Sequence, residues 1–465
     1  MKRRTLILAA AAAFGLPSCM TNPPGLPETL PRERASLPAA WNAPDITGSA
    51  ASARDNWWVD LGIPELTTLI EKGFSRSHSM RSALAALEAA RAEARAVGAD
   101  LYPYVDLGAG YSRGRTVSST SGKSQTSRTA KIAAAASWEL DFWGRNRNER
   151  EAAIAAADSK LWASRAVRLS LSGSIARQYL ALLNAREMIR ISESNLEIMR
   201  KTSEITDAKL SAGTATPTDA ETARSDVATA EAALANRKLA ADLALHALAL
   251  LTADPELALP EANGPLPSAP SVRPGIPSEL LQNRPDVRAA ASTLQSAHAS
   301  VAVAYAAFFP SISLTGSAGT QSRTLGALFS KGIWSAGISL DLPIFDAGRR
   351  SAEYDRSKAV EAGALEAYRL AAETAYADVR DALSSIQYSR EAERSRLAAL
   401  NSARSAVKNA QSRYQHGSGS FLALLTAQRA LNDASVAHES AKLATLESFI
   451  SLNLALGAGR GTPES

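Results

Sequence analysis

The sequence has little of what an enzyme or a metalloprotein needs. It contains one cysteine, Cys19, in 465 residues, which excludes an intrachain disulfide. Its five histidines are scattered, and none has a second ligand at a metal-binding spacing. A phosphate-binding loop, a dinucleotide-binding glycine fingerprint and a nucleophile elbow are all missing. These absences predict a protein that is not an enzyme and that holds no metal or catalytic cofactor.

Aromatic residues are also scarce, at 6% of the chain, whereas alanine is abundant. Small side chains suit helices that approach one another closely better than they suit a thick globular core. The formal charge is only +5, and Lys2, Arg3 and Arg4 of the N-terminal leader contribute three of these charges. The near-balance that remains gives no argument for a nucleic-acid partner.

The N-terminus has the parts of an export signal. Lys2–Arg4 precede an apolar run, residues 6–16, that is too short to stay in a bilayer as a spanning helix. Leu16, Ser18 and Cys19 then resemble the processing site of a bacterial lipoprotein, although Pro17 departs from it. We expect Cys19 to carry a covalent lipid (palmitate). The alternative is an ordinary signal peptide with an incidental cysteine.

A long stretch with a seven-residue apolar repeat dominates the middle of the chain. The repeat is typical of a helix that packs along a partner helix. Gly213 can end this helix, and Thr216 can cap a second helix that begins with Pro217 and carries Asp219 near its positive end. The repeat comprises Leu161, Ile175, Leu182, Ile189, Leu196 and Leu210.

The same pattern returns 204 residues later, the offset that takes Gly213 to Gly417. A shared offset for a heptad phase and a turn glycine indicates an internal duplication. The shifted positions are Leu365, Val379, Ile386, Glu393, Leu400 and Tyr414, of which only Glu393 is not apolar.

Each repeat also contains two runs in which apolar and polar residues alternate, as in β-strands with one apolar face. Trp138 and Trp334 occupy matching places in these runs. Four strands cannot close a membrane barrel, so a barrel would need strands from several chains. The alternative is a soluble β-hairpin subdomain.

The expected fold class is therefore mainly α with a membrane β-barrel part. We expect a helix from Pro64 to Gly98, with a break at Gly73, before the first strand. The tryptophans Trp41, Trp57 and Trp58 should pin the proline-rich tether by packing, and the alternative is a role at the membrane interface. The expected segments are a signal peptide (1–18), a lipidated tether (19–63), a first repeat (64–251) with a β-hairpin (104–141) and a helical hairpin (146–251), a linker (252–277), a second repeat (278–457) with a β-hairpin (311–342) and a helical hairpin (348–457), and a C-terminal tail (458–465).

Several motifs resemble those of the outer-membrane factor (TolC-like) family, in the lipoprotein branch of RND-type efflux systems. Together they cover nearly the whole mature chain. They are Trp138–Arg145 (WELDFWGR), Leu281–Ala290 (LQNRPDVRAA), Phe309–Leu314 (FPSISL), Leu342–Arg349 (LPIFDAGR), and Arg413-Tyr414-x-x-Gly417 with Ala427-Gln428.

The resemblance implies a homotrimer with a 12-stranded barrel and an α-helical tunnel in the periplasm. It also implies docking to a periplasmic adaptor protein and an RND-type inner-membrane pump, with the lipid on Cys19 in the outer membrane. The function expected from it is an outer-membrane channel that exports solutes passively. The rival hypothesis is a non-porous coiled-coil lipoprotein that acts as a periplasmic spacer.

The resemblance places the closing aperture of the tunnel at the two helical turns. The residues it assigns there are Thr218, Asp219, Tyr414, Gly417 and Phe421. Asp219 could equally be an N-terminal dipole partner, and Tyr414 could be a packing residue of the heptad. Gly419, Ala423 and Thr426 stand where relatives often carry charges, so we expect closure to rest more on apolar packing.

Overall fold

The structure of the chain is a computed structural model, and it describes residues 56–117, 122, 124–260, 266–271, 280–416 and 418–458. The signal peptide, Cys19, Trp41, Gly417 and the tail from residue 459 lie outside the described residues. Contacts divide the chain into two compact units. Among the described residues, the first unit contains 86–160 and 289–369, and the second contains 56–85, 161–288 and 370–458.

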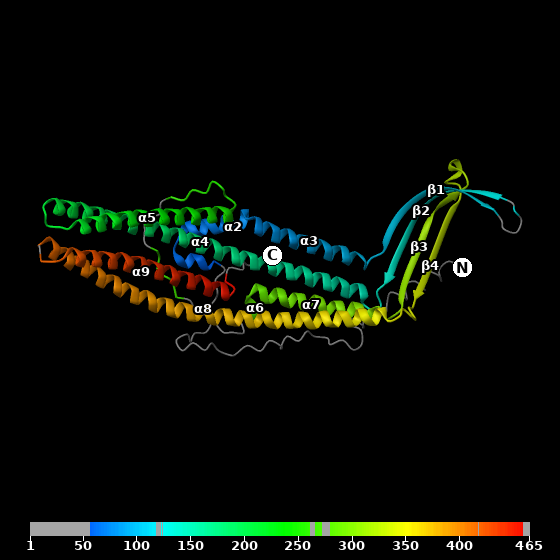
Figure 1. Cartoon of the computed structure of the whole chain (residues 1–465). Helices are drawn as coiled ribbons and strands as arrows, with labels where there is room; N and C mark the ends of the chain where they lie inside the picture. Colours follow the sequence, from blue (N-terminus) through cyan, green and yellow to red (C-terminus); the bar gives the residue numbers. More distant parts are fainter. Residues whose placement is uncertain are drawn as a thin grey trace. The chain divides into compact units, whose positions relative to one another are not determined.

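The first unit is built around one antiparallel sheet of four strands in the order β1-β2-β3-β4. The strands are β1 (Tyr104–Val117), β2 (Ser124–Leu140), β3 (Ser311–Ser322) and β4 (Gly332–Asp341), with a short 3₁₀ turn, η4 (Leu325–Ala327), between the last two. The two hairpins come from the two repeats and join through β2 and β3 (Figure 1).

The register of the sheet brings the apolar positions of all four strands onto one face. One row across the sheet contains Val105, Ala136, Gly316 and Ala336. The next apolar row contains Leu107, Ala134, Ala318 and Trp334. The opposite face carries polar rows such as Asp106, Ala135, Ser317 and Ser335. The alternation predicted from the sequence is therefore confirmed as a single two-faced sheet.

No described part of the chain covers that apolar face. The side chains of Leu107, Trp334 and Ile338 are 74%, 81% and 71% exposed. Among the described strands, β1 pairs only with β2 and β4 pairs only with β3, so each has one free side. The sheet therefore presents both a free apolar surface and two open edges.

The strands are connected to helices by two short turns with matching chemistry. At the end of β2, the carboxylate of Asp141 accepts hydrogen bonds from the backbone N–H groups of Asn146 (3.0 Å) and Arg147 (2.9 Å). After β4, the carboxylate of Asp346 accepts from the N–H groups of Gly348 and Arg350, both at 3.1 Å. Each aspartate thus satisfies N–H groups that a helix start leaves without partners.

The helices are long and form two hairpins. The first consists of α4 (Arg145–Ser211) and α5 (Pro217–Thr252), and the second of α8 (Arg349–Gln415) and α9 (Phe421–Ala455). At 67 residues each, α4 and α8 extend roughly 100 Å. The remaining helices are α2 (Pro64–Arg76), α3 (His78–Ala99), α6 (Leu280–Asn283) and α7 (Pro285–Ala306), and the 3₁₀ helix η2 (Trp57–Leu61) precedes them.

Three of the six predicted heptad positions on each long helix are buried, and the other three are half-buried. On α4, Ile175, Leu182 and Leu196 are at most 7% exposed. On α8, Val379, Ile386 and Leu400 are at most 6% exposed. None of the helices in the described part of the chain combines the length and apolar character that crossing a membrane requires.

The expected break at Gly73 is wrong. Helix α2 continues to Arg76, and the break is at Ser77, whose extended backbone (ψ 133°) separates α2 from α3. Gly73 instead marks a close approach, because a Cβ there would lie 2.4 Å from Cδ1 of Ile175 on α4. Gly73 therefore marks a close packing contact between helices and not the end of a helix.

Trp57 and Trp58 do pack into the second unit, as expected for the end of the tether. They are 0% and 2% exposed. The Trp57 ring meets Phe449 of α9 edge-on, with ring centroids 6.2 Å apart, and Trp58 meets Phe74 of α2 at 5.8 Å. Two indoles therefore fix η2 between helices that are distant in sequence.

Replacing Trp57 with alanine should destabilise the second unit by about 3–5 kcal/mol, because a fully buried aromatic side chain is removed. The measurement is the thermal unfolding temperature of the purified protein in detergent. Val59→Ala is the matched control, since Val59 lies in the same turn but is 54% exposed. Equal unfolding temperatures for the two variants would show that η2 does not contribute to the core.

Candidate functional site at the hairpin ends

Backbone hydrogen bonds stabilise the turn at the end of the first helical hairpin. The N–H of Thr214 donates to the carbonyl of Lys209 (2.8 Å), and Gly213 has a left-handed backbone with φ 75°. These bonds satisfy carbonyls that the end of α4 would leave free. Thr216, two residues after Thr214, is the N-terminal capping residue of α5.

Asp219 and Thr216 form a reciprocal cap at that start. The hydroxyl of Thr216 accepts from the N–H of Asp219 (3.2 Å). The carboxylate of Asp219 accepts from the N–H (3.0 Å) and the hydroxyl (2.8 Å) of Thr216. These hydrogen bonds, the backbone one foremost, lower the pKa of Asp219 below its ordinary value. Asp219 is therefore a charged capping residue at an exposed helix start.

At the second hairpin end, the first turn of α9 contains no acidic residue comparable to Asp219. Ser420 caps α9 by accepting from the N–H of Ala423 at 3.2 Å. The N–H groups of Ser418 and Gly419 both donate to the carbonyl of Arg413, at 2.9 and 3.0 Å. A Cβ on Gly419 would lie 3.0 Å from the Arg413 Cβ and 3.1 Å from the Tyr414 nitrogen, so this turn leaves little room for a larger side chain.

The two hairpins meet through a cation–π contact. Nζ of Lys209, in the last turn of α4, lies 3.6 Å from the ring centroid of Tyr414 on α8. The Tyr414 ring is also 6.1 Å from that of Phe421, the first residue of α9. One tyrosine therefore joins the ends of three helices.

A small apolar cluster supports this contact farther along the helices. Its buried members are Leu196, Met199, Ala230 and Leu425, which come from α4, α5 and α9. Phe421 packs against it and is partly buried. An apolar contribution to the packing between the hairpins is therefore present at the second hairpin end.

Polar contacts between the hairpins add to the cluster. The guanidinium of Arg429 on α9 pairs with Asp226 of α5, whose side chain is 15% exposed. The amide of Gln428 is 3.5 Å from the hydroxyl of Thr202 on α4. Asp226 and Arg429 are 203 residues apart, one residue from the repeat offset, so the pair joins nearly equivalent places on α5 and α9.

The structure brings together only part of the residue set predicted from the sequence. Tyr414 and Phe421 are in contact, and Thr218 and Asp219 lie at the other hairpin end. No hydrogen bond, ion pair or ring contact joins Asp219 to Tyr414 or Phe421 within the described residues. Sequence reasoning missed Lys209 and the pair of Asp226 and Arg429. The internal duplication is the sequence feature that points to Lys209, since the 204-residue offset aligns Lys209 with Arg413, the neighbour of Tyr414.

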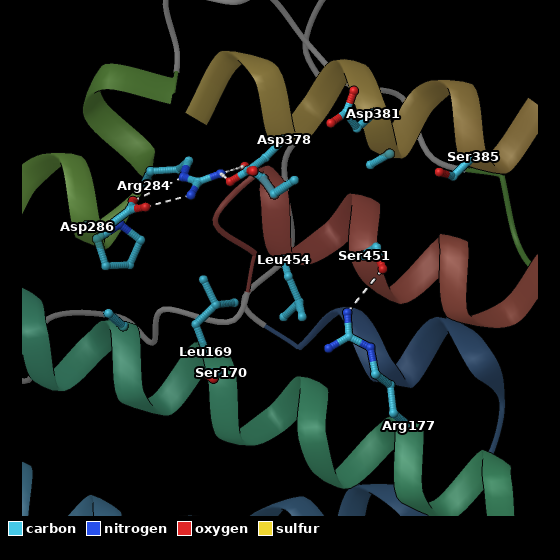
Figure 2. Close-up of a pocket in the computed structure, with 14 residues that line it drawn as sticks. Leu169, Ser170, Arg177, Arg284, Asp286, Asp378, Asp381, Ser385, Ser451 and Leu454 are labelled. Atoms are coloured by element: carbon cyan, nitrogen blue, oxygen red, sulfur yellow. Dashed lines mark hydrogen bonds and ion pairs between the residues drawn. The ribbon is translucent and has the colours of Figure 1, made fainter. Parts of the chain in front are cut away.

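Arg284 organises a second polar site, at the start of α7 (Figure 2). Its guanidinium donates to Asp286 through Nε (3.0 Å) and Nη2 (2.5 Å), and through Nη1 to Asp378 of α8 (2.8 Å) and the carbonyl of Ala455 (3.2 Å). Burial alone would lower the pKa of Arg284, but hydrogen bonds and charge attraction from the two aspartates outweigh it and raise the pKa.

An open cavity of about 450 Å³ lies beside this network. Arg177 of α4 reaches across it and donates to the hydroxyl of Ser451 on α9 at 3.0 Å, while Asp381 of α8 lies on its wall (Figure 2). The lining mixes both signs of charge. In the described residues no group of three His, Cys, Asp or Glu side chains is placed to hold a metal ion. The network acts as a structural joint between α7, α8 and α9.

Comparison with known proteins shows the family. The profile described as "Outer membrane efflux protein" matches residues 69–254 and 276–458. The chain belongs to this family. The motif Trp138–Arg145 contains the turn after β2, and Arg284–Asp286 forms the polar network at the start of α7. The motif Arg413–Tyr414 lies at the contact between the two hairpins.

Individual relatives match over nearly the full length. The chain is 33% identical to the "Pyoverdine export outer membrane protein OpmQ" of Pseudomonas aeruginosa over 99% of this chain and 97% of the relative. It is 31% identical to "Outer membrane protein OprJ" of the same species, over 97% and 95%. Outer-membrane efflux is therefore the function of this family member, and the expected non-enzymatic role is confirmed.

Solved structures agree with the fold. The outer-membrane channel OprN superposes with a TM-score of 0.86 at 28% identity, covering 92% of this chain and 99% of that one. The MtrE outer membrane channel of Neisseria gonorrhoeae, described in an open state, gives a TM-score of 0.82 at 30% identity, covering 93% and 98%. The predicted helical hairpins with four strands per chain are thus the fold of known outer-membrane channels.

The lowered pKa of Asp219 predicts a pH-dependent helix start. The cap stabilises the first turn of α5 above the ordinary pKa of an aspartate, and this stabilisation is lost as the pH falls through the lowered folded-state pKa. Amide hydrogen exchange of residues 218–224, measured from pH 7 to pH 3, should show protection that decreases only at the acid end.

Two comparisons attribute the change in exchange to the carboxylate of Asp219. The start of α9 is capped by Ser420, which does not titrate, so its protection corrects for the intrinsic pH dependence of exchange. Asp219→Asn should remove the difference between the two helix starts. A first turn of α5 that follows the α9 reference at every pH would contradict the role of the carboxylate.

Proposed function

We propose that the protein is the outer-membrane channel of a tripartite efflux pump, formed by three copies of the chain and anchored by a lipid on Cys19. Three copies supply twelve strands for one closed barrel and twelve helical segments for a periplasmic tunnel. The channel is passive and docks to a periplasmic adaptor protein and an inner-membrane pump of the RND type. The observation that carries the proposal is the two-faced sheet with two open edges.

The open edges support closure between copies. Backbone N–H and C=O groups on the free sides of β1 and β4 need partners, and no water supplies them inside a bilayer. Joining β4 of one copy to β1 of the next satisfies these groups in a ring. The apolar rows with Leu107 and Trp334 then face lipid, and the polar rows with Asp106 and Ser335 face the lumen.

Cys19 completes this arrangement at the membrane. It follows an export signal at the position where a lipoprotein is processed, and Met20 rather than aspartate follows it. In enteric bacteria, aspartate at that position retains lipoproteins in the inner membrane, so Met20 permits sorting to the outer membrane. The proposed anchor therefore agrees with the outer-membrane family of the chain.

The gate of the tunnel is proposed at the hairpin ends, with Thr218, Asp219, Tyr414, Gly417 and Phe421 around the aperture. Lys209 belongs with them, because its contact with Tyr414 holds the two hairpins together. The open-state description of the similar MtrE channel supports a gate that changes conformation. We assign Asp219 to the charge of the aperture and Tyr414 with Lys209 to its closure.

The cargo is proposed to be selected by the partner pump. Relatives that match nearly the whole chain are named for pyoverdine export, toluene efflux and cation efflux. One fold therefore serves chemically different solutes. The polar face of β3 and β4 consists mainly of Ser, Thr and Gly.

The assembly is tested by purifying the lipidated protein in detergent and measuring sedimentation and heat-modifiable migration. We expect a heat-sensitive trimer that gives small, mostly closed conductances in planar bilayers. A monomer that stays in solution without detergent would contradict the channel and favour the non-porous spacer.

Lys209→Met should increase the open probability of the channel in planar bilayers. The cation–π contact at an exposed site is worth about 0.5–1 kcal/mol, so the open-to-closed ratio should rise roughly twofold to fivefold per copy. Tyr414→Leu should act in the same direction while keeping apolar packing. Lys201→Met is the matched control, because Lys201 pairs with Glu197 within α4. Unchanged gating in Lys209→Met would remove this contact from the gate.

A further inference from the structure

Three arginines continue the apolar face of the sheet toward the loop of the first hairpin. Arg113 and Arg115 follow Tyr111 on β1 at alternate positions, so they point to the same side as Leu107 and Tyr111. Arg128 on β2 is the register partner of Arg113. We call Arg113, Arg115 and Arg128 the outer arginine cluster. All three are exposed.

The cluster begins where the apolar band ends. On β2 the outward positions from Leu140 to Ala130 are apolar, and they span ten residue steps. At about 3.3 Å per residue and a strand tilt near 45°, this stretch covers roughly 23 Å of height, close to the apolar band of about 25 Å in membrane barrels. Arg128 is the next outward residue beyond Ala130. It therefore lies at the level of lipid headgroups.

The cluster lies at the end of the sheet that is remote from the helices. Helix α3 leads into β1 at Tyr104, and β2 leads into α4 after Leu140, whereas the arginines lie near the opposite ends of both strands (Figure 1). This step rests on the proposed function, in which the helices are periplasmic. The cluster then lies in the outer, cell-surface leaflet.

These cations have no carboxylate partners in their own segments. The sequence contains no Asp or Glu in residues 107–138 or 311–340. Arg113 and Arg128 lie directly opposite each other, and like charges at such positions repel and destabilise a sheet. Among the described residues, Arg115 donates to the neutral hydroxyl of Ser124, at 3.0 Å. The cations of these two segments are Arg113, Arg115, Lys123, Arg128, Lys131, Arg323 and Lys331.

We propose that the outer arginine cluster binds the phosphate groups of lipids in the outer leaflet. A guanidinium presents donors in a planar fork that matches a phosphate, and one phosphate between Arg113 and Arg128 replaces their repulsion with attraction. The ligand is a lipid rather than a free anion because apolar surface, with Tyr111 at its edge, continues directly below the cluster. Acyl chains contact that surface while the headgroup meets the arginines.

The test uses the full-length trimer in detergent and titrates bisphosphorylated lipid A, with binding measured by native mass spectrometry. Dephosphorylated lipid A with the same acyl chains is the parallel probe. Each arginine near a charged lipid surface contributes roughly a fivefold gain in affinity, so R113Q/R115Q/R128Q should bind the phosphorylated lipid about a hundredfold more weakly. The dephosphorylated lipid should bind wild type and variant equally.

The chain offers a matched control on the same strand. Lys131 lies three residues after Arg128, on the opposite face, where its register partners are Gly110 and Gln321. R128Q and K131Q remove the same charge, but only R128Q should weaken lipid binding. R113K/R115K/R128K keeps the charge and should retain most of the affinity. Heat-modifiable migration confirms that each variant is a folded trimer.

The outcomes separate the lipid site from the channel itself. Equal affinity of wild type for the two lipids, or an equal loss in K131Q and R128Q, would overturn the lipid site. Full competition by millimolar inorganic phosphate would also overturn it in favour of a soluble-anion site. Wild-type trimers that conduct but show no phosphate preference would leave the proposed channel intact. A failure to form trimers would instead count against the channel.

Discussion

The free hydrogen-bonding edges of β1 and β4 are the constraint on which the rest of this molecule depends. An antiparallel sheet of four strands that is apolar on one face can be stable only if that face meets an apolar medium and the edges find partners. Leu107, Trp334 and Ile338 are exposed on the apolar face, and no described part of the chain covers them. A closed ring of copies in a membrane meets both requirements at once.

The helical hairpins meet a different requirement, because they must pack along great lengths without a thick core. Their buried stripe is formed by heptad residues such as Ile175 and Val379, and the small residues between them let the backbones approach. Gly73 against Ile175 shows how close these helices come. At the hairpin ends the stripe gives way to weaker contacts, including the ring of Tyr414 with Lys209. The proposed gate lies at this local weakness, where it opens without unfolding the long helices.

Much of the fold followed from the sequence because its patterns are local and periodic. The two strand pairs, the heptad stripes and the Thr216 cap depend on residues that are close in the chain, and the duplication shows the same local patterns twice. The break at Gly73 was misplaced because a glycine in a helical pattern can mark either a helix end or a close contact. Only the position of Ile175 on another helix distinguishes the two. The contacts of Lys209, Asp226 and Arg429 were missed, because their partners lie about 200 residues away.

The sequence by itself determined the periods, the turn residues and the faces of the strands, since these depend on backbone geometry and on the alternation of side chains. The tertiary structure decided the register that brings Val105, Ala136, Gly316 and Ala336 into one row. It also decided that Tyr414 meets Lys209 and not Asp219, whose carboxylate bonds to Thr216. Such pairings between distant segments depend on how whole elements pack, and no local pattern specifies them.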